Sequence, residues 1–305
     1  EEVEVAGNIG NLKDINLVLD NGGEGIGLFR TEFLYMDRSN LPPEEEQYKI
    51  YRKAAESMGQ KPLIIRTLDI GGDKELSYLD LPQEMNPFLG YRAIRLCLDQ
   101  KERIFKPQLR AILRASVHGN IKIMYPLITS LQELREANHI LEEVREELRE
   151  EGSDFDENME IGIMIETPSA VAVADNLAQE ADFFSIGTND LIQYTTAVDR
   201  TNGKIAGRHT PYSPAVLRFI KQTIEAGKKN NIWVGMCGAA AGNKLLLPFL
   251  LGAGLDEFSM SAGKITTIKD LMEKWTRKDG EEIVENVLKL KTSSEVKEYL
   301  NKQKR

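Results

Sequence analysis

The chain has 305 residues, of which 41% are hydrophobic and 29% are charged, and its formal net charge is −9. These proportions are typical of a globular protein and exclude a disordered chain. The negative charge argues against nucleic acid as the main partner, because binding a phosphate backbone needs a basic surface. If the chain binds a small anion, we therefore expect arginines to cluster at that site.

The cysteines and the start of the chain indicate a cellular compartment. Cys97 and Cys237 are too few for a disulfide framework and are typical of a reducing cytoplasm. Three of residues 1–4 are glutamates, whereas a signal peptide begins with basic residues. The most apolar stretch, residues 245–251, is far shorter than the roughly 20 residues that span a bilayer. We therefore expect a cytoplasmic protein that has no membrane segment.

Short apolar runs alternate with helical stretches along the chain. The runs lack a clear polar and apolar alternation, as expected of parallel strands that are buried on both faces. Residues 131–149 carry apolar side chains at helical spacing, and residues 215–226 follow Ser213 and Pro214, which are typical of a helix start. The apolar runs are residues 3–6, 25–29, 63–66, 121–125, 161–165, 183–186, 233–236 and 257–260.

Eight buried strands that alternate with helices predict a (βα)8 TIM barrel, and an open doubly wound sheet is the alternative. We interpret residues 150–160 as a loop between a helix and a strand, because short apolar runs alternate with helical stretches on both sides of it. A domain boundary is the alternative. The sequence thus predicts one barrel domain over residues 1–305. In such a barrel the chemistry lies just beyond the carboxyl ends of the strands.

Four arginines lie at or after the predicted strands. Arg30 directly follows one apolar run, Arg66 ends the next, and Arg92 and Arg200 lie farther along in GYRAIR and AVDRTN. A single arginine is more often a surface or salt-bridge residue. However, an arginine at the end of a buried strand must face the barrel mouth or be paired, because an unpaired buried charge is costly. Guanidinium groups suit bidentate contacts with phosphate and carboxylate.

Two carboxylates follow consecutive predicted strands. Glu166 comes directly after the run at 161–165, and Asp190 comes four residues after the run at 183–186. Both would face the same mouth, where one or two carboxylates together with substrate oxygens suit Mg²⁺. A pair of acid and base groups, or salt bridges to the arginines, are the alternatives. A site rich in arginines and carboxylates favours a phosphate bridged by a metal.

Cys237 follows the run at 233–236 and precedes a glycine. Most cysteines are buried and inert, but a thiol beside arginines at a barrel mouth could be a proton donor or a nucleophile. Cys97 lies in a helical stretch and is expected in the core. The segment IGGDK lacks the spacing of a Walker A motif, so we interpret it as a loop in which Lys74 is a weak candidate for a phosphate contact.

Seven separated motifs carry a family resemblance from residue 3 to residue 262. In this range the chain resembles the C-terminal domain of bacterial enzyme I of the phosphoenolpyruvate:sugar phosphotransferase system. More distantly, it is similar to pyruvate phosphate dikinase and phosphoenolpyruvate synthase. The motifs occur in order at the predicted strand ends and read GIGLFRTEFLYMDR, IIRTLDIGGDK, MNPFLGYRAIR, MIETPSA, FFSIGTNDLIQYTTAVDR, GMCG and LDEFSMSA.

The resemblance implies an enzyme domain that binds phosphoenolpyruvate together with Mg²⁺. It implies that Glu166 and Asp190 hold the Mg²⁺ and that Cys237 protonates the enolate carbon to give pyruvate. This assignment fits a reaction in which positioning and neutralisation of charge supply most of the catalysis. The residues implied to hold the phosphate and the carboxylate of phosphoenolpyruvate are Arg30, Arg66, Arg92, Asn189 and Arg200.

The resemblance also implies partners. It implies a homodimer, a phosphohistidine on an N-terminal domain and, through that domain, the carrier protein HPr of sugar transport. The glycine-rich threonine-serine-histidine motif of that domain is absent here, and His118, His139 and His209 stand in other contexts. We therefore expect the chain to begin after that domain, and to bind phosphoenolpyruvate without completing the transfer alone.

The sequence departs from the family pattern after Cys237. The family usually has glutamate and aspartate at the positions of Ala239 and Asn243, and residues from 263 onward also differ. The loss of two anions predicts a lower pKa of the Cys237 thiol, fewer partners for the arginines, and altered turnover with binding retained. A phosphoenolpyruvate-binding sensor without productive transfer, and an enolate-forming lyase on the same fold, are the alternatives.

Overall fold

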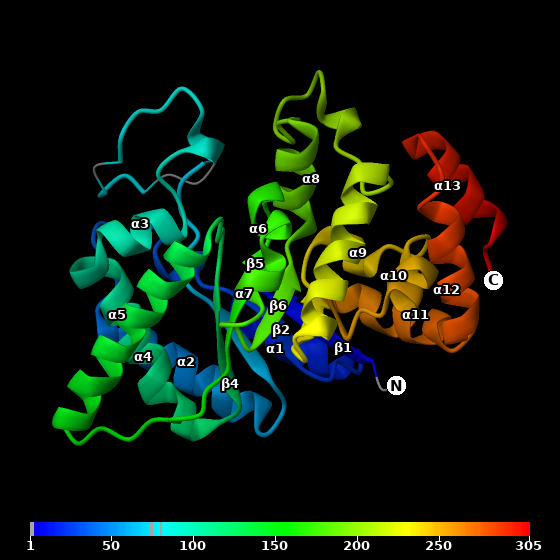
Figure 1. Cartoon of the computed structure of the whole chain (residues 1–305). Helices are drawn as coiled ribbons and strands as arrows, with labels where there is room; N and C mark the ends of the chain where they lie inside the picture. The colour runs from blue at the N-terminus through cyan, green and yellow to red at the C-terminus, as the bar shows by residue number, and fades with distance from the viewer. Residues whose placement is uncertain (1–2, 73–75, 80) are drawn as a thin grey trace.

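The computed structural model of the chain describes residues 3–72, 76–79 and 81–305, and its strands form a closed barrel (Figure 1). All neighbouring strands are parallel, and β8 pairs with β1. This closure confirms the predicted TIM barrel and excludes the open sheet. The strands are β1 (Glu4–Ile9), β2 (Ile26–Arg30), β3 (Leu63–Arg66), β4 (Ile121–Tyr125), β5 (Ile161–Ile165), β6 (Phe183–Ile186), β7 (Trp233–Met236) and β8 (Glu257–Met260).

The first two strands differ from the predicted ranges, whereas the bounds of the other six coincide with them. Strand β1 runs on to Ile9, so Asn8 lies inside the strand and not after it. Gly7 and Asn8 continue the pairing with β2 across an irregularity in register. Strand β2 ends at Arg30, which pairs with Arg66 of β3. Backbone pairing, and not the apolar run, therefore sets these two strand ends.

Helices surround the barrel (Figure 1). The two predicted helices are confirmed as α5 (Leu131–Glu150) and α9 (Pro214–Lys229), although Ser213 makes no side-chain cap at the start of α9. Within the described residues, no helix is both long and apolar enough to cross a membrane. The other helices are α1 (Lys13–Asp20), α2 (Glu44–Met58), α3 (Ile94–Asp99), α4 (Lys106–Ala115), α6 (Pro168–Ala172), α7 (Ala174–Leu177), α8 (Thr188–Thr196), α10 (Leu247–Ala253), α11 (Ala262–Met272), α12 (Arg277–Val287) and α13 (Ser293–Lys302).

Single turns join several of these elements. The 3₁₀ turns are η1 (Glu32–Leu34), η2 (Pro87–Leu89), η4 (Ser116–His118), η5 (Ala206–Arg208) and η6 (Ala239–Gly242), and η3 (Lys101–Phe105) is a π-helical turn. Three of them, η1, η2 and η6, lie in the segments that follow β2, β3 and β7 at the carboxyl ends of the strands.

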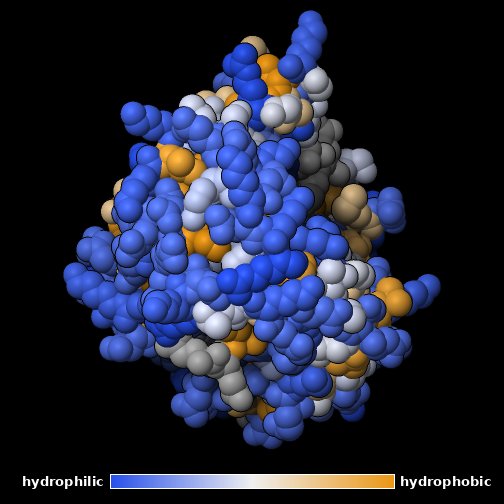
Figure 2. All heavy atoms as spheres, turned by 90° about the vertical axis from the view of Figure 1, so that its right-hand side faces the viewer, coloured by the Kyte–Doolittle hydropathy of each residue, from blue (hydrophilic) through white to orange (hydrophobic). Residues whose placement is uncertain are grey.

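Helices α12 and α13 follow the last strand and helix of the barrel, and the side of the molecule that carries them is mostly hydrophilic, with scattered hydrophobic side chains (Figure 2). Helix α12 packs closely on α10 at a pair of glycines. A Cβ atom on Gly252 would lie only 2.0 Å from the carbonyl carbon of Gly280. Side chains larger than hydrogen would therefore force the two helices apart.

An apolar layer fills the interior of the barrel. We call it the interior layer, and Trp233 packs against it from the amino-terminal ends of the strands, with its ring stacked 4.4 Å from that of Phe183. Because the strands are parallel, all their carboxyl ends lie on one side of this layer and all their amino ends on the other. The interior layer consists of Leu28, Ile64, Met124, Met164, Phe183 and Cys237.

Candidate active site

A cavity of about 320 Å³ lies at the carboxyl ends of the strands, which is where a TIM barrel is expected to carry its active site. We call it the upper cavity. Arg92 is outside its lining but contacts Asp190, which is part of it. The structure thus brings all of the predicted site residues together. Those that line the upper cavity are Arg30, Arg66, Glu166, Asn189, Asp190, Arg200 and Cys237.

Arg66 is buried at the end of β3 and is paired with two carboxylates. It forms an ion pair with Glu32, and its Nη1 atom lies 2.9 Å from Oδ2 of Asp69. Burial alone would lower the pKa of Arg66, but Glu32 and Asp69 outweigh it, so the pKa lies above the ordinary value. The guanidinium group is therefore charged and held in one orientation.

Arg92 connects the loop after β3 to α8. Its Nη2 atom donates to Oδ1 of Asp69 at 2.9 Å and to Oδ2 of Asp190 at 3.0 Å. Its Nη1 atom donates to the Tyr194 hydroxyl at 3.1 Å, and that hydroxyl donates to the carbonyl of Phe88. Asp69, which also pairs with Arg66, thus links two buried arginines into one network.

Arg200 and Arg30 lie nearer to solvent. Arg200 pairs with Asp190 at 2.8 Å, and both Arg200 and Arg92 place the guanidinium carbon 5.6 Å from the ring centre of Phe88. Arg30 is exposed, and its guanidinium group makes no hydrogen bond or ion pair with any part of the chain that the structure describes. Its positive charge is free to meet an anion in the upper cavity.

Glu166 lies at the bottom of the upper cavity and is 2% exposed. Its Oε1 atom accepts a hydrogen bond from the backbone N–H of Leu127 at 2.7 Å. Burial, followed by the negative charges of Asp190 and Asp69, raises the pKa of Glu166 to about 8. The surroundings therefore disfavour an ionised carboxylate here unless a cation accompanies it.

These carboxylates fit a hydrated magnesium ion. Glu166 and Asp190 offer hard oxygen donors from two neighbouring strands and their loops. Among the described residues, no group of three or more histidine, cysteine, aspartate or glutamate side chains is placed to hold a metal ion. A metal at this site would need water or substrate oxygens to complete its shell, and Mg²⁺ is the ion that usually binds in this way.

The Cys237 thiol is buried at the edge of the upper cavity. Burial is the largest cause that raises its pKa, to about 12, and the charge of Glu166 also raises it. The thiol pKa thus lies above its ordinary value, whereas the lowering expected from the loss of two anions, relative to the family pattern, stays a prediction. Cys97 is buried in α3, which confirms its place in the core.

The residues that depart from the family pattern do not line the upper cavity. The side chain of Asn243 caps the following turn, since its Oδ1 atom accepts from the N–H groups of Leu245 at 3.0 Å and Leu246 at 3.3 Å. Aspartate can cap a turn in the same way. The backbone N–H of Ala239 donates to Oδ1 of Asn189 at 3.3 Å, which helps to orient that predicted contact residue.

Three contributors to the network were not singled out from the sequence, namely Glu32, Phe88 and Tyr194. Each lies inside one of the seven motifs, and that position is the signal that could have found them. Asp69 also lies in a motif but was given no role. Lys74, the candidate for a phosphate contact, lies outside the described residues.

Comparison with known proteins places the chain in a family. Residues 1–277 match the family model described as PEP-utilising enzyme, PEP-binding domain. The chain is 55% identical over 294 residues to the phosphoenolpyruvate-protein phosphotransferase of Staphylococcus carnosus (strain TM300), covering 96% of this chain and 51% of that protein. It is 52% identical over 298 residues to the protein of the same name from Priestia megaterium, covering 98% and 52%. The chain thus spans about half the length of the curated relatives it matches.

Solved structures of similar shape belong to other proteins. A citrate lyase from Burkholderia xenovorans LB400 has a TM-score of 0.56 at 14% identity, covering 99% of this chain and 90% of that chain. A HpcH/HpaI aldolase/citrate lyase family protein from Burkholderia cenocepacia J2315 has a TM-score of 0.53 at 13% identity, covering 90% and 93%. At this identity the likeness concerns the fold alone.

Proposed function

The chain belongs to the family of PEP-utilising enzymes and matches the PEP-binding domain of that family. From that premise we propose that the upper cavity binds phosphoenolpyruvate together with Mg²⁺. The proposed reaction transfers the phosphoryl group to a histidine on a separate domain and releases pyruvate. The observation that carries the proposal is the convergence of arginines, carboxylates and a buried thiol in one cavity. The names of the relatives at 52–55% identity favour this reaction over a lyase or a sensor.

The arginines bind and orient the substrate in this proposal. Phosphoenolpyruvate carries a phosphate and a carboxylate, and each suits the fork of a guanidinium group. Arg30 lacks a partner among the described residues and is the group most available to the phosphate. Arg66 and Arg92 are held rigidly by carboxylates, so their donors need little reorganisation when the substrate arrives. Arg200 and Asn189 complete the contacts from the other side of the cavity.

Glu166 and Asp190 are the residues that would hold Mg²⁺. When bound, the ion neutralises charge on the phosphoryl oxygens and helps to align the group for transfer. Asp190 also holds two arginines in place, because it pairs with Arg92 and with Arg200 through different oxygens. Leu28 and Met164 line the same cavity and exclude water from its floor.

Cys237 supplies a proton at the end of the proposed reaction. Breaking the phosphorus–oxygen bond sends the phosphoryl group to an imidazole nitrogen and leaves the enolate of pyruvate. The Cys237 thiol then donates its proton to the methylene carbon, which gives pyruvate and a thiolate that regains a proton from solvent. A thiol whose pKa is raised to about 12 by burial is protonated at neutral pH, as a proton donor must be.

The partners follow from the same proposal. We propose that residues 1–305 form one phosphoenolpyruvate-binding barrel domain that acts as a homodimer in the cytoplasm. The phosphoryl acceptor is a histidine on an N-terminal domain, which passes the group to the carrier protein HPr of sugar transport. Incubation of the isolated chain with phosphoenolpyruvate and Mg²⁺ should produce no phosphohistidine, and detection of one by acid-labile phosphate analysis would contradict the separate acceptor.

Calorimetry tests the binding site directly. Phosphoenolpyruvate is titrated into the chain with and without Mg²⁺, and into Glu166→Ala, which removes one proposed ligand. We expect binding that depends on Mg²⁺ and is lost in Glu166→Ala. Glu225→Gln, at an exposed carboxylate on α9 that pairs with Lys221, serves as the control and should bind normally. An absence of binding under every condition would show that the family fold is kept without this function.

A further inference from the structure

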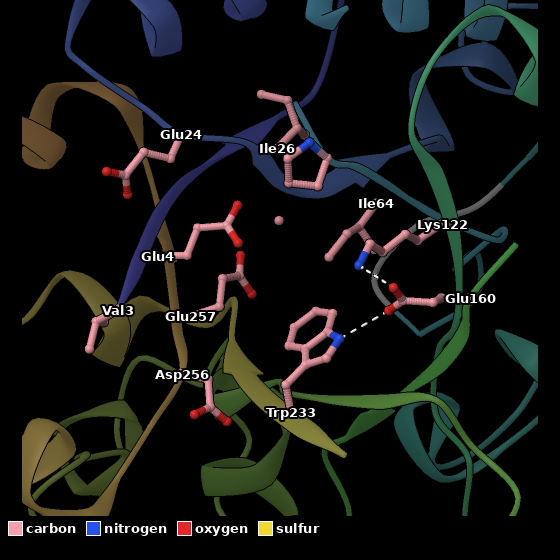
Figure 3. A pocket seen from close by; sticks show the side chains of 12 residues that line it. Val3, Glu4, Glu24, Ile26, Ile64, Lys122, Glu160, Trp233, Asp256 and Glu257 are labelled. Atoms are coloured by element: carbon pink, nitrogen blue, oxygen red, sulfur yellow. Dashed lines mark hydrogen bonds and ion pairs between the residues drawn. The ribbon is translucent and has the colours of Figure 1, made fainter. Parts of the chain in front are cut away.

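A second cavity, of about 630 Å³, opens at the amino ends of the strands, on the opposite side of the interior layer from the upper cavity (Figure 3). We call it the lower cavity. Its lining includes Glu4 and Glu257, the first residues of β1 and β8, and also Trp233, the first residue of β7. Glu257 belongs to the motif LDEFSMSA, to which the proposed reaction assigns no role.

Glu257 is buried without a partner. The residue is 3% exposed, and neither of its carboxylate oxygens has a hydrogen-bond partner in the part of the chain that the structure describes. Two glycines leave the space that its carboxylate occupies, since a Cβ atom on Gly27 would lie 1.8 Å from Oε1 and one on Gly235 would lie 2.2 Å from Oε2. Burying a polar group without a hydrogen bond is costly, and native structures rarely do so without a reason.

Glu4 stands beside Glu257 in the same position of the neighbouring strand. The two residues are in register, so both side chains lie on the same face of the sheet, and Figure 3 shows both carboxylates directed into the lower cavity. Among the described residues, the Glu4 carboxylate makes no hydrogen bond or ion pair, and the two carboxylates do not bond to each other. Carboxylates in directly opposed positions repel, so either a proton or a bound cation stabilises this pair.

The lysines that line or border the lower cavity already bond to other groups. Nζ of Lys61, whose charge lowers the pKa of Glu4, donates to the carbonyl of Gly23 at 3.3 Å. Nζ of Lys122 bonds to Glu160 at 2.7 Å, and Glu160 also accepts from the Trp233 indole at 3.0 Å, as the dashed lines in Figure 3 show. Nζ of Lys269 bonds to Glu24 at 2.8 Å. A bound cation that pairs with Glu4 and Glu257 must therefore come from outside these contacts.

We propose that the lower cavity binds a small primary ammonium ion, whose N–H groups donate to Glu4 and Glu257. An ammonium group has three donors, enough to reach both carboxylates at once. The cavity volume lies in the range of sites for small organic ligands. Ile26, Pro62 and Ile64 give the lining an apolar part against which a carbon chain can pack. This apolar part favours a cation that carries a carbon chain over a bare metal ion.

The test uses n-butylamine as the ammonium probe and n-butanol as a probe of the same shape without charge. Both are titrated by calorimetry into the whole chain at neutral pH in an amine-free phosphate buffer. We expect saturable binding of one n-butylamine per chain and no binding of n-butanol. Glu257→Gln and Glu4→Gln should each weaken the binding of n-butylamine about tenfold or more, because each removes a charge-assisted acceptor.

Glu24→Gln is the matched control, because Glu24 lines the same cavity but is already paired with Lys269. It should change n-butylamine binding by less than about threefold. An equal loss in Glu24→Gln would show that diffuse negative charge, and not the Glu4 and Glu257 pair, attracts the amine. Binding that is absent in the wild type, or unchanged in both Glu4→Gln and Glu257→Gln, would overturn the proposal.

Two further outcomes also decide the matter. If Mg²⁺ binds in a way that depends on Glu4 and n-butylamine does not bind, the cavity is a metal site and the proposal fails. If Glu257→Gln does not fold, as judged by circular dichroism, Glu4→Gln at its half-buried position carries the test. n-Butylamine should bind equally well to Glu166→Ala, so a failure of the proposed phosphoenolpyruvate site and a failure of the ammonium site can be told apart.

Discussion

Replacing Glu257 with glutamine should make the stability of the chain less sensitive to pH. The substitution keeps the shape of the side chain between Gly27 and Gly235 but removes its ability to ionise. Burial raises the pKa of Glu257 to about 8 from an ordinary value of 4.5, the charge of Glu4 also raises it, and the charge of Lys122 opposes the rise. Folding therefore favours the protonated form of this carboxyl group.

The direction of the effect follows from proton linkage. Because the folded-state pKa is raised, the unfolded chain releases this proton at lower pH than the folded chain does. The contribution of Glu257 to stability is complete below about pH 4.5, is lost progressively as the pH rises, and levels off above about pH 8. Each pH unit within that interval costs about 1.4 kcal/mol, so between about pH 6 and pH 8 the wild-type chain loses about 2 to 3 kcal/mol through this one group.

Urea unfolding of the wild type and of Glu257→Gln, followed by circular dichroism at pH 6 and pH 8, measures this loss. Other titrating groups, Glu166 among them, contribute equally to both proteins and cancel in the comparison. We expect the free energy of unfolding of Glu257→Gln, relative to the wild type, to rise by about 2 to 3 kcal/mol between the two pH values. Phosphate should be the buffer, because an amine buffer could occupy the lower cavity.

Glu24→Gln again provides the matched comparison, and its difference from the wild type should stay nearly constant over the same pH range, since Lys269 already pairs with the Glu24 carboxylate. A Glu257→Gln difference that varies by less than about 0.5 kcal/mol between pH 6 and pH 8 would refute the reasoning. Such a result would mean that water or a bound cation already satisfies the Glu257 carboxylate in the folded chain.

Three further predictions concern other parts of the molecule. Gly280→Ala should lower the free energy of unfolding by about 1 to 3 kcal/mol, because the added methyl group forces α10 and α12 apart. Gly263→Ala, where the structure leaves open space on α11, should be neutral or slightly stabilising. Equal losses for the two variants in urea unfolding would contradict the close contact between α10 and α12. Cys237→Ser should keep its affinity for phosphoenolpyruvate but slow pyruvate formation about 100-fold or more when the acceptor domain is supplied, and unchanged turnover would rule out the thiol as the proton donor. The double change Ala239→Glu with Asn243→Asp should alter turnover in the same assay while leaving stability almost unchanged, and an unaltered rate would show that this loop does not limit the reaction.

Most of the barrel could be predicted from the sequence because its strands are buried on both faces. The runs that became β3 to β7 contain mainly apolar residues, and most of these strands end where a polar residue, a glycine or a proline follows. The prediction was wrong at β1, where Gly7 and Asn8 are not apolar yet remain paired with the neighbouring strand. Pairing between backbones depends on the partner strand, which a local pattern does not reveal.

The sequence predicted which residues form the candidate site, but not which of their side chains form ion pairs with one another. Residues such as Arg30 and Glu166 follow strands directly, so the barrel alone brings them to one mouth. The link from Arg66 through Asp69 to Arg92 depends on how the loop after β3 folds back, and no spacing in the sequence encodes it. The raised pKa of Cys237 could not be predicted for a related reason, because burial, its largest cause, is a property of the folded chain.

The interior layer is thin enough that a charge in the lower cavity affects the pKa of a group at the upper cavity. Trp233 begins β7 in the lower cavity, and Cys237 directly follows the end of the same strand, so about 13 Å of apolar interior separates the two cavities. After burial and Glu166, the charge of Glu257 also raises the pKa of the Cys237 thiol. In a medium of low permittivity such a field is weakly screened. A cation that settles beside Glu257 would oppose this field and ease loss of the thiol proton, with no atom of the barrel having to move.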